Sequence, residues 1–335
     1  MTAKIKETTC GEWPALQMCN DTLELVIVPT LGGKITSLRS LLTNREWLWT
    51  NPYLPQRDPT ERSDGAQSNY VGEFDTGGWD EVFPTVNSCL VQDTPWGDTP
   101  LTDHGEIWRR PAEVASTTSS NGALASVTLR AGGEPLPFTF ERAFTLAANE
   151  ARFEIAYRLT NHADQPLPYI WAAHPLLNIE PGMRIDLPDQ VKVTCTSGTG
   201  EDLPEFGKLF SWPGATSSRG KPLDLSRVPE PTGLAVKLFT QPLDRGWVAV
   251  TSADGRESFR LDFANSRPTH IGIWLNYGGW SGSGSPPYFN VGIEPTSSPC
   301  DTLTDAIAQN LAAMVPPNET QQWTLTTTLI QQKGN

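Results

Sequence analysis

Three side chains able to carry protons lie in segments of unusual local composition. His104 is in DHGEIW, His174 in WAAHPLLNI and Glu294 in FNVGIEPTSSP. One carboxylate and two imidazoles can supply a general base, a general acid and a polar stabiliser, with pKa values tunable near neutrality. A histidine before a proline, or a carboxylate at the end of a strand, is often structural, and spacing alone does not bring the three together.

The neighbours of two of these residues sharpen the hypothesis. Glu294 is the only charged residue in its apolar run VGI and directly precedes a proline. A carboxylate there must be paired, hydrogen-bonded or shifted in pKa, because leaving it charged and bare costs several kcal/mol. His174 follows an apolar strand-like run and precedes Pro175, so we expect it at the end of a strand.

The sequence predicts β-strands over most of the chain, and these strands could position the two histidines and the glutamate. Apolar and polar residues alternate with period two in many segments, and clusters of Gly, Pro, Asn and Asp bound them. Such alternation gives each strand one wet and one dry face, as in antiparallel sheets packed into a sandwich. The segments are 23–29, 34–41, 123–131, 137–147, 151–161, 167–177, 233–240, 246–253, 258–264, 269–277 and 321–330.

One helix is predicted near 302–315, in TLTDAIAQNLAAMV. Thr302 and Asp305 form a capping box, and Leu303, Ile307, Leu311 and Met314 form an apolar stripe. Residues 51–75 and 278–287 are rich in turn formers, and long loops in compact domains are often functional. With no internal repeat or long linker in view, we predict a single all-β domain over residues 1–335.

Composition narrows the class of ligand. The formal net charge of −13 and the dispersed Lys and Arg residues argue against nucleic acid and anionic lipid as partners. No run approaches the ~20 apolar residues that span a bilayer, and the start resembles no signal peptide. Five scattered cysteines without zinc-ligand spacing favour a reduced, cytoplasmic setting. A small molecule is the expected partner.

Several motifs, in this order, resemble the aldose 1-epimerase (galactose mutarotase-like) superfamily. No one motif is highly specific, but together they span nearly the whole chain. The resemblance implies a large antiparallel β-supersandwich with few short helices. The matching segments are TLGGKITSLRS (30–40), GGWDEVFPTV (77–86), LTDHGEIWRRP (101–111), residues 140–179 and VGIEPTSSPCD (291–301).

The resemblance also implies roles in the interconversion of sugar anomers. The family's glutamate, the general base on the anomeric hydroxyl, falls on Glu294. Its proton donor to the ring oxygen falls on His174, and its polarising histidine falls on His104. Such ring opening requires no metal, nucleotide or redox cofactor.

Four further residues are predicted to contact a sugar substrate. Trp79 could stack on a pyranose face beside the paired glycines of GGWDE, and Asp80 could accept hydrogen bonds from hydroxyls. Trp274 is a second stacking candidate, and Arg109 could pair with an anionic group. The arginines typical of galactose and hexose-6-phosphate mutarotases are absent at the matching positions, where NYVGEFDTGGWDE includes Thr76, so the sugar stays open.

Two alternatives follow from the same residues. A carbohydrate-binding protein could keep the pocket without turnover, although binding alone does not need an acid and a base together. A glycoside hydrolase needs two carboxylates flanking the scissile bond, and Glu294 with Glu106 or Asp80 could form that pair.

Overall fold

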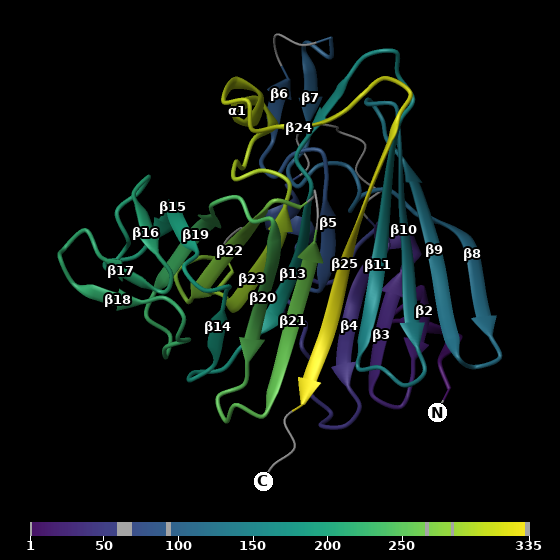
Figure 1. Ribbon diagram of the computed structural model, residues 1–335, viewed down its shortest axis with the longest axis horizontal. Helices are drawn as coiled ribbons and strands as arrows, with labels where there is room; N and C mark the ends of the chain where they lie inside the picture. Colours follow the sequence, from purple (N-terminus) through teal and green to yellow (C-terminus); the bar gives the residue numbers. More distant parts are fainter. Residues whose placement is uncertain (1, 59–68, 92–94, 265–267, 283–284, 332–335) are drawn as a thin grey trace.

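Two large antiparallel sheets form most of the molecule (Figure 1). The computed structural model describes residues 2–58, 69–91, 95–264, 268–282 and 285–331. In that part of the chain, the larger sheet has eleven strands and the smaller has eight. The all-β antiparallel architecture predicted from the alternating segments is confirmed. The single-domain prediction stays a prediction.

The larger sheet has the strand order β1 (Lys4–Cys10), β2 (Trp13–Cys19), β3 (Leu23–Val28), β4 (Lys34–Ser40), β5 (Trp79–Val82), β13 (Ala172–Asn178), β23 (Phe289–Thr296), β22 (His270–Tyr277), β19 (Leu234–Thr240), β15 (Lys192–Thr199) and β16 (Leu209–Ser211). The smaller sheet runs β14 (Arg184–Asp186), β20 (Arg245–Thr251), β21 (Glu257–Ala264), β25 (Thr320–Gln331), β11 (Arg152–Asn161), β10 (Phe138–Ala147), β9 (Leu124–Gly132) and β8 (Glu113–Ser120).

Short elements complete the described fold. Three two-stranded sheets pair β6 (Cys89–Val91) with β7 (Thr99–Leu101), β12 (Leu167–Tyr169) with β24 (Ala313–Val315), and β17 (Gly214–Thr216) with β18 (Pro222–Asp224). The helical pieces are a 3₁₀ turn (Pro29–Leu31), a π-helix (Tyr70–Phe74) and α1 (Leu303–Ala308). Among the described residues, none of the helices is long and apolar enough to span a membrane.

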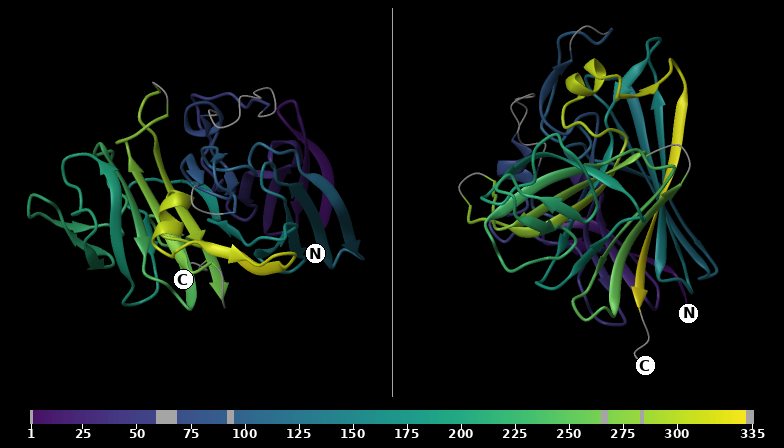
Figure 2. Two further views of the ribbon diagram at one scale, coloured as in Figure 1. Left: turned by 90° about the horizontal axis from the view of Figure 1, so that it is seen from above. Right: turned by 60° about the vertical axis from the view of Figure 1, so that its left-hand side comes forward.

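Burial patterns differ between the smaller sheet and the centre of the larger one. Along β10, buried and half-buried residues alternate without a break, as its sequence predicts, and the buried face contributes Phe138, Phe140 and Phe144 to the core. In the larger sheet, β5 is buried throughout, and β13, β22 and β23 nearly so. One face of these central strands packs on the core, so other segments must cover their second face. Figure 2 shows the layers from two further directions.

Two local predictions are wrong. The predicted helix over 302–315 ends at Ala308, and its last residues form β24, which leaves Leu311 and Met314 exposed. Thr302 does cap the helix, accepting a hydrogen bond from the Asp305 amide. Competing β-pairing with β12 takes the remaining apolar residues.

The predicted strand 167–177 is in fact two strands in different sheets, and His174 lies inside β13 rather than at a strand end. Pro175 is accommodated because the pairing of β13 with β23 is interrupted around it, between Ala172 and Leu176. A proline has no amide hydrogen to donate to a neighbouring strand.

Candidate active site

Strand register brings His174 and Glu294 face to face. Ala172 pairs with Thr296 and Leu176 with Gly292, so His174, two residues along from each pair, is opposite Glu294. Successive side chains of a strand alternate between its faces, and this pair points away from the core. The distance from His174 Nε2 to Glu294 Oε1 is 3.7 Å, too long for a direct hydrogen bond.

Two glycines leave room for the Glu294 carboxylate because they have no side chains. Gly272 pairs directly with Glu294 across β22 and β23. A Cβ atom at Gly272 would lie 3.0 Å from Glu294 Oε2, and one at Gly292 would lie 2.9 Å from Glu294 Oε1. Because Gly272 has no side chain, Lys237 reaches past it from β19, the next strand of the sheet, and its ammonium donates a hydrogen bond to Glu294 Oε2.

Charge and burial set the protonation of the pair. Burial alone would raise the pKa of Glu294, but the Lys237 ammonium, followed by His174, outweighs it and the net pKa is lowered. Burial lowers the pKa of His174 to about 4, against the opposing attraction of Glu294. At neutral pH, the free protein therefore holds an ionised carboxylate beside a neutral imidazole.

His104 approaches the pair from outside the sheet. Its ring stacks on Tyr70 of the π-helix, with centroids 4.2 Å apart, and meets the His174 ring edge-on at 5.1 Å. Asp103 Oδ1 is 2.8 Å from His104 Nδ1, which fixes the ring and leaves Nε2 as the nitrogen open to a ligand.

The backbone at His104 is also constrained. His104 has a φ of 58° and Gly105 a φ of 73°, in the left-handed region where glycine is favoured. A Cβ at Gly105 would lie 2.0 Å from the carbonyl oxygen of Phe83. The His-Gly pair thus serves a tight turn that holds the histidine.

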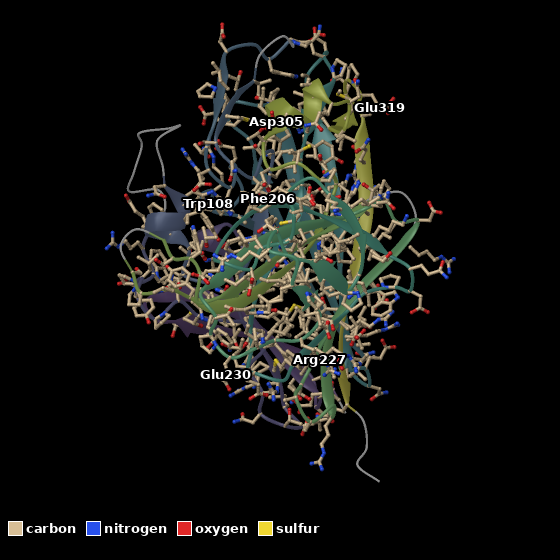
Figure 3. All side chains as sticks on the ribbon, turned by 90° about the vertical axis from the view of Figure 1, so that its left-hand side faces the viewer. Trp108, Phe206, Arg227, Glu230, Asp305 and Glu319 are labelled. Atoms are coloured by element: carbon tan, nitrogen blue, oxygen red, sulfur yellow. The ribbon has the colours of Figure 1, made fainter. Side chains whose placement is uncertain are left out.

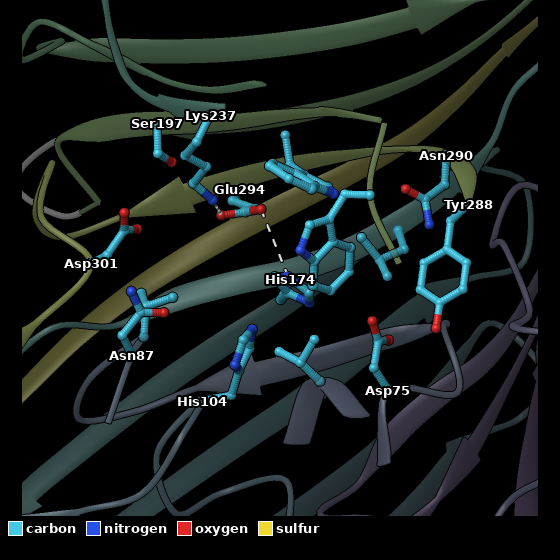
Figure 4. A pocket seen from close by; sticks show the side chains of 15 residues that line it. Asp75, Asn87, His104, His174, Ser197, Lys237, Tyr288, Asn290, Glu294 and Asp301 are labelled. Atoms are coloured by element: carbon cyan, nitrogen blue, oxygen red, sulfur yellow. Dashed lines mark hydrogen bonds and ion pairs between the residues drawn. The ribbon is translucent and has the colours of Figure 1, made fainter. Parts of the chain in front are cut away.

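These groups line one cavity of about 200 Å³. Figure 4 shows Glu294 between Lys237 and His174, with Asn87 and Asp301 at one end and Asp75 and Tyr288 at the other. The lining residues combine aromatic rings with polar side chains and are Val71, Asp75, Val86, Asn87, His104, His174, Leu176, Ser197, Lys237, Trp274, Trp280, Tyr288, Asn290, Glu294 and Asp301.

Four buried polar atoms of this lining have no hydrogen-bond partner within the described ranges. They are Glu294 Oε1, His174 Nδ1, Tyr288 Oη and Asn290 Oδ1. Buried polar atoms are nearly always satisfied by protein or ordered water, so these four atoms mark where water or a polar ligand could bind. No group of three or more His, Cys, Asp or Glu in the described chain is arranged to hold a metal ion.

The model of the aldose 1-epimerase family matches residues 14–226, more than half of the chain. The chain belongs to the aldose 1-epimerase family. The resemblance inferred from its motifs is thereby confirmed. No curated protein matches the sequence significantly.

Solved structures share the family's fold. A candidate aldose 1-epimerase from Klebsiella pneumoniae superposes with a TM-score of 0.74 at 16% identity, covering 98% of this chain and 83% of that one. A galactose mutarotase-like protein from Clostridium acetobutylicum gives 0.64 at 15% identity, covering 99% of both chains. A galactose mutarotase related enzyme from Lactobacillus acidophilus gives 0.62 at 16%, covering 95% of this chain and 97% of that one. At these identities, the likeness concerns the fold.

Within this member of the aldose 1-epimerase family, four of the seven predicted site residues line the cavity. His104, His174, Glu294 and Trp274 come together there. Trp79, Asp80 and Arg109 are not part of the described lining.

Trp79 and Asp80 point to opposite faces of β5. The Trp79 side chain is fully buried in the hydrophobic core, so its placement does not support a role in stacking on sugar. Asp80 lies on the side of His174 but is covered: it accepts a hydrogen bond from Tyr70 Oη at 2.6 Å and pairs with Lys34 Nζ at 2.8 Å.

The paired glycines of GGWDE serve the protein's own backbone. A Cβ at Gly77 would lie 2.1 Å from the carbonyl oxygen of Trp49, and one at Gly78 would lie 2.6 Å from that of Ile35. These two glycines therefore permit a close approach between neighbouring segments of the protein.

Arg109 and Glu106 belong to a separate cluster. Arg109 Nε is 3.7 Å from Glu106 Oε2, and Arg110 Nη2 is 3.5 Å from the same oxygen. Neither Glu106 nor Asp80 lines the cavity, so neither forms with Glu294 the carboxylate pair that hydrolysis would need there.

Sequence reasoning missed Lys237, Asp75, Tyr288, Asn290 and Trp280. Lys237 had a signal, because it is the single charge in the apolar strand GLAVKLFT, the same feature that singled out Glu294. Asn290 lies four residues before Glu294 on one strand and therefore on the same face. The other three lie outside the regular strands, where periodicity gives no guide.

Proposed function

We propose that this protein is a mutarotase, an isomerase that interconverts the α and β anomers of an aldose. The observation that carries the proposal is the partnerless Glu294 Oε1, buried in a cavity 3.7 Å from His174 Nε2. A cyclic aldose has two oxygens, O1 and O5, on one carbon. A base and an acid this close can engage both oxygens of one sugar.

The proposed reaction assigns one proton transfer to each residue of the pair. Glu294 takes the proton of the O1 hydroxyl while His174, in its protonated form, gives a proton to O5, and the C1–O5 bond breaks as the C1–O1 bond becomes a carbonyl. Rotation about C1–C2 then presents the other face of the aldehyde. Closure reverses both transfers, so the protein ends unchanged. Each positioned transfer is worth roughly 10²–10⁴-fold in rate.

Two neighbours assist this pair. Lys237 keeps Glu294 ionised and in place through its hydrogen bond to the other carboxylate oxygen. His104, oriented by Asp103, offers Nε2 to the ring oxygen and helps to polarise it. The charges of Glu294 and Lys237 are buried, so they act on O1 and O5 more strongly than they would in water.

The charges of the lining favour a sugar without an anionic group. Asp75, Glu294 and Asp301 face the cavity, and among its described lining residues the only lysine or arginine is Lys237, already paired with Glu294. A phosphate or carboxylate would meet uncompensated like charge, which costs several kcal/mol. A cytoplasmic setting, expected from the cysteine pattern, remains part of the proposal.

The test is anomeric exchange by NMR on a panel of neutral and anionic aldoses. Saturation transfer between the α and β anomeric protons measures exchange with and without the protein. We expect enhanced exchange for at least one neutral aldose and weaker or no enhancement for its 6-phosphate or uronate. Sugar binding without enhanced exchange across the panel would contradict the proposal and favour a carbohydrate-binding protein.

A further inference from the structure

A second hollow adjoins the cavity. It is an open groove of about 620 Å³, and Asn87 and Asp301 line both spaces. These two residues lie at one end of the cavity in Figure 4, opposite Asp75 and Tyr288. The two spaces therefore meet at Asn87 and Asp301, and a ligand that occupied both would cross this pair.

The cavity and the groove are successive stretches of one sheet. On β19, Lys237 lines the cavity, whereas Phe239, two residues along on the same face, lines the groove. On β15, Ser197 lines the cavity and Thr196 lines the groove. Thr196 is the residue skipped by the pairing with β19, at the register shift between Cys195 and Ser197. Because the two spaces share these strands, the groove has a fixed position relative to the cavity.

The segment that contains α1 forms the other wall. Asp305, labelled in Figure 3 at the end of the molecule that carries the helix, and Gln309 line the groove from this side. The wall is thus fixed by the Thr302 cap, and the same segment packs on β6 through the hydrogen bond from Thr304 Oγ1 to the Leu90 carbonyl at 2.9 Å.

The chemistry of the groove suits a neutral polyol. Thr196, Gln241 and Gln309 are exposed and offer hydroxyl and amide groups, while Leu209 and Leu311 expose apolar surface beside them. Sugars present both hydroxyl edges and apolar C–H faces. None of the described groove residues is Lys or Arg, so a phosphate or nucleotide substituent would find no cation there.

We propose that the groove binds a second sugar unit, joined to the reducing sugar in the cavity by a glycosidic bond. The substrates are then reducing disaccharides or longer oligosaccharides. The inference rests on the proposed mutarotase function, because the reducing end must occupy the Glu294–His174 pair. Binding energy from a remote sugar unit can raise kcat/KM at the reacting carbon.

The test compares matched sugars by the same NMR exchange measurement. Glucose and galactose are set against their 1→2-, 1→3-, 1→4- and 1→6-linked disaccharides, with the reducing sugar held constant within each pair. We expect at least one disaccharide to exceed its monosaccharide in kcat/KM by tenfold or more. Enhanced exchange for monosaccharides, with no disaccharide above its partner, would overturn the groove assignment and leave the mutarotase proposal standing.

Two variants locate the effect. Thr196→Trp should fill the groove and lower the disaccharide-to-monosaccharide ratio of kcat/KM at least fivefold, and Gln241→Ala should lower it about two- to tenfold, the worth of one hydrogen bond. Gln322→Ala, an exposed glutamine on β25 of the other sheet, is the matched control for the second. An unchanged ratio in both groove variants would overturn the inference. Absence of exchange with every sugar would overturn the mutarotase proposal itself.

Discussion

Two buried glutamates, Glu81 and Glu294, lie near cations in neighbouring parts of the larger sheet, yet their surroundings differ. Both side chains are almost fully buried. Glu81 faces the core from β5, where Tyr157 Oη donates to Oε1 at 2.9 Å and Trp171 Nε1 donates to Oε2 at 2.8 Å. Glu294 gives one oxygen to Lys237 and leaves the other without a partner, in a cavity.

The pKa values of the two glutamates are shifted in opposite directions. Burial raises the pKa of Glu81 to about 7, because Arg142, 3.7 Å away, only partly offsets the loss of solvent. The guanidinium of Arg142 also donates to the carbonyls of Gly32 and Gly33. Lys237 is in direct contact with Glu294 and lowers the pKa there. Burial near a cation is common to both residues and does not distinguish a base. We propose Glu294 as the base because its carboxylate is ionised and one of its oxygens has no partner.

Among the variants that test the contrast between Glu81 and Glu294, His174→Asn should lower anomeric exchange the most. The variant removes the acid opposite the free oxygen of Glu294, and we expect anomeric exchange to fall by about 10²–10⁴-fold. His162→Asn, which changes an exposed histidine bonded to Thr139, should leave exchange unchanged. Equal rates for the two variants would remove His174 from the mechanism.

The pH dependence of wild-type kcat/KM tests the same residue. With the pKa of His174 lowered to about 4 by burial, the imidazolium that we propose as the donor to O5 becomes scarcer as pH rises. The rate should therefore increase from pH 7 toward pH 5. A profile that stays flat from pH 5 to 9 would point to another donor, of which Lys237 is the nearest to Glu294.

Lys237→Met makes Glu294 resemble Glu81 by removing its cation. Burial then dominates and the pKa of Glu294 should rise, so less of the base is ionised in mild acid. We expect kcat/KM to fall about tenfold or more at pH 5, since one pKa unit is a factor of ten, with a smaller loss at pH 8. Lys237→Arg should restore much of the activity, whereas an unmoved pH profile would contradict the positioning role.

Glu81→Gln should separate stability from activity. Gln can accept only one of the two hydrogen bonds, so we expect a loss of about 1–3 kcal/mol in the free energy of unfolding and near wild-type exchange. The raised pKa makes wild-type stability fall as pH rises from about 4.5 to 7, because the folded state holds the extra proton there. Urea unfolding of the variant should lack this contribution, and a loss of exchange without destabilisation would break the contrast.

The smallest expected effect concerns acid stability. Burial lowers the pKa of His270 to about 4, as it does that of His174. Between pH 6.5 and 4 the unfolded chain binds these protons and the folded chain does not, so stability is lost as pH falls. His270→Gln should make the fall shallower by on the order of 1 kcal/mol, measured by urea unfolding at pH 7.5 and 4.5. An unchanged slope would contradict it.

Period-two alternation could predict strands of the smaller sheet such as β10 and β11, because one face of each is more exposed than the other. The same alternation could have corrected the prediction for GGWDE. Adjacent residues of a strand point to opposite faces, so Trp79 and Asp80 could not both contact one sugar. A single charged residue within an apolar strand singled out Glu294, and the same pattern could have singled out Lys237.

Other parts of the site depend on partners distant in the sequence. The register that places His174 opposite Glu294 joins residues 120 positions apart, and no local pattern encodes it. Asp75 and Tyr288 lie outside regular strands. The helix over 302–315 was overextended because its last residues pair with β12, a tertiary contact that outweighs helical propensity.

The central claim, that Glu294 is the base of a mutarotase, is tested most directly by anomeric exchange in Glu294→Gln with the best aldose of the panel. Sugar affinity is measured in parallel by NMR titration. The account predicts exchange reduced by about 10²–10⁴-fold while the dissociation constant stays within a few-fold of wild type. Near wild-type exchange in this variant would contradict it.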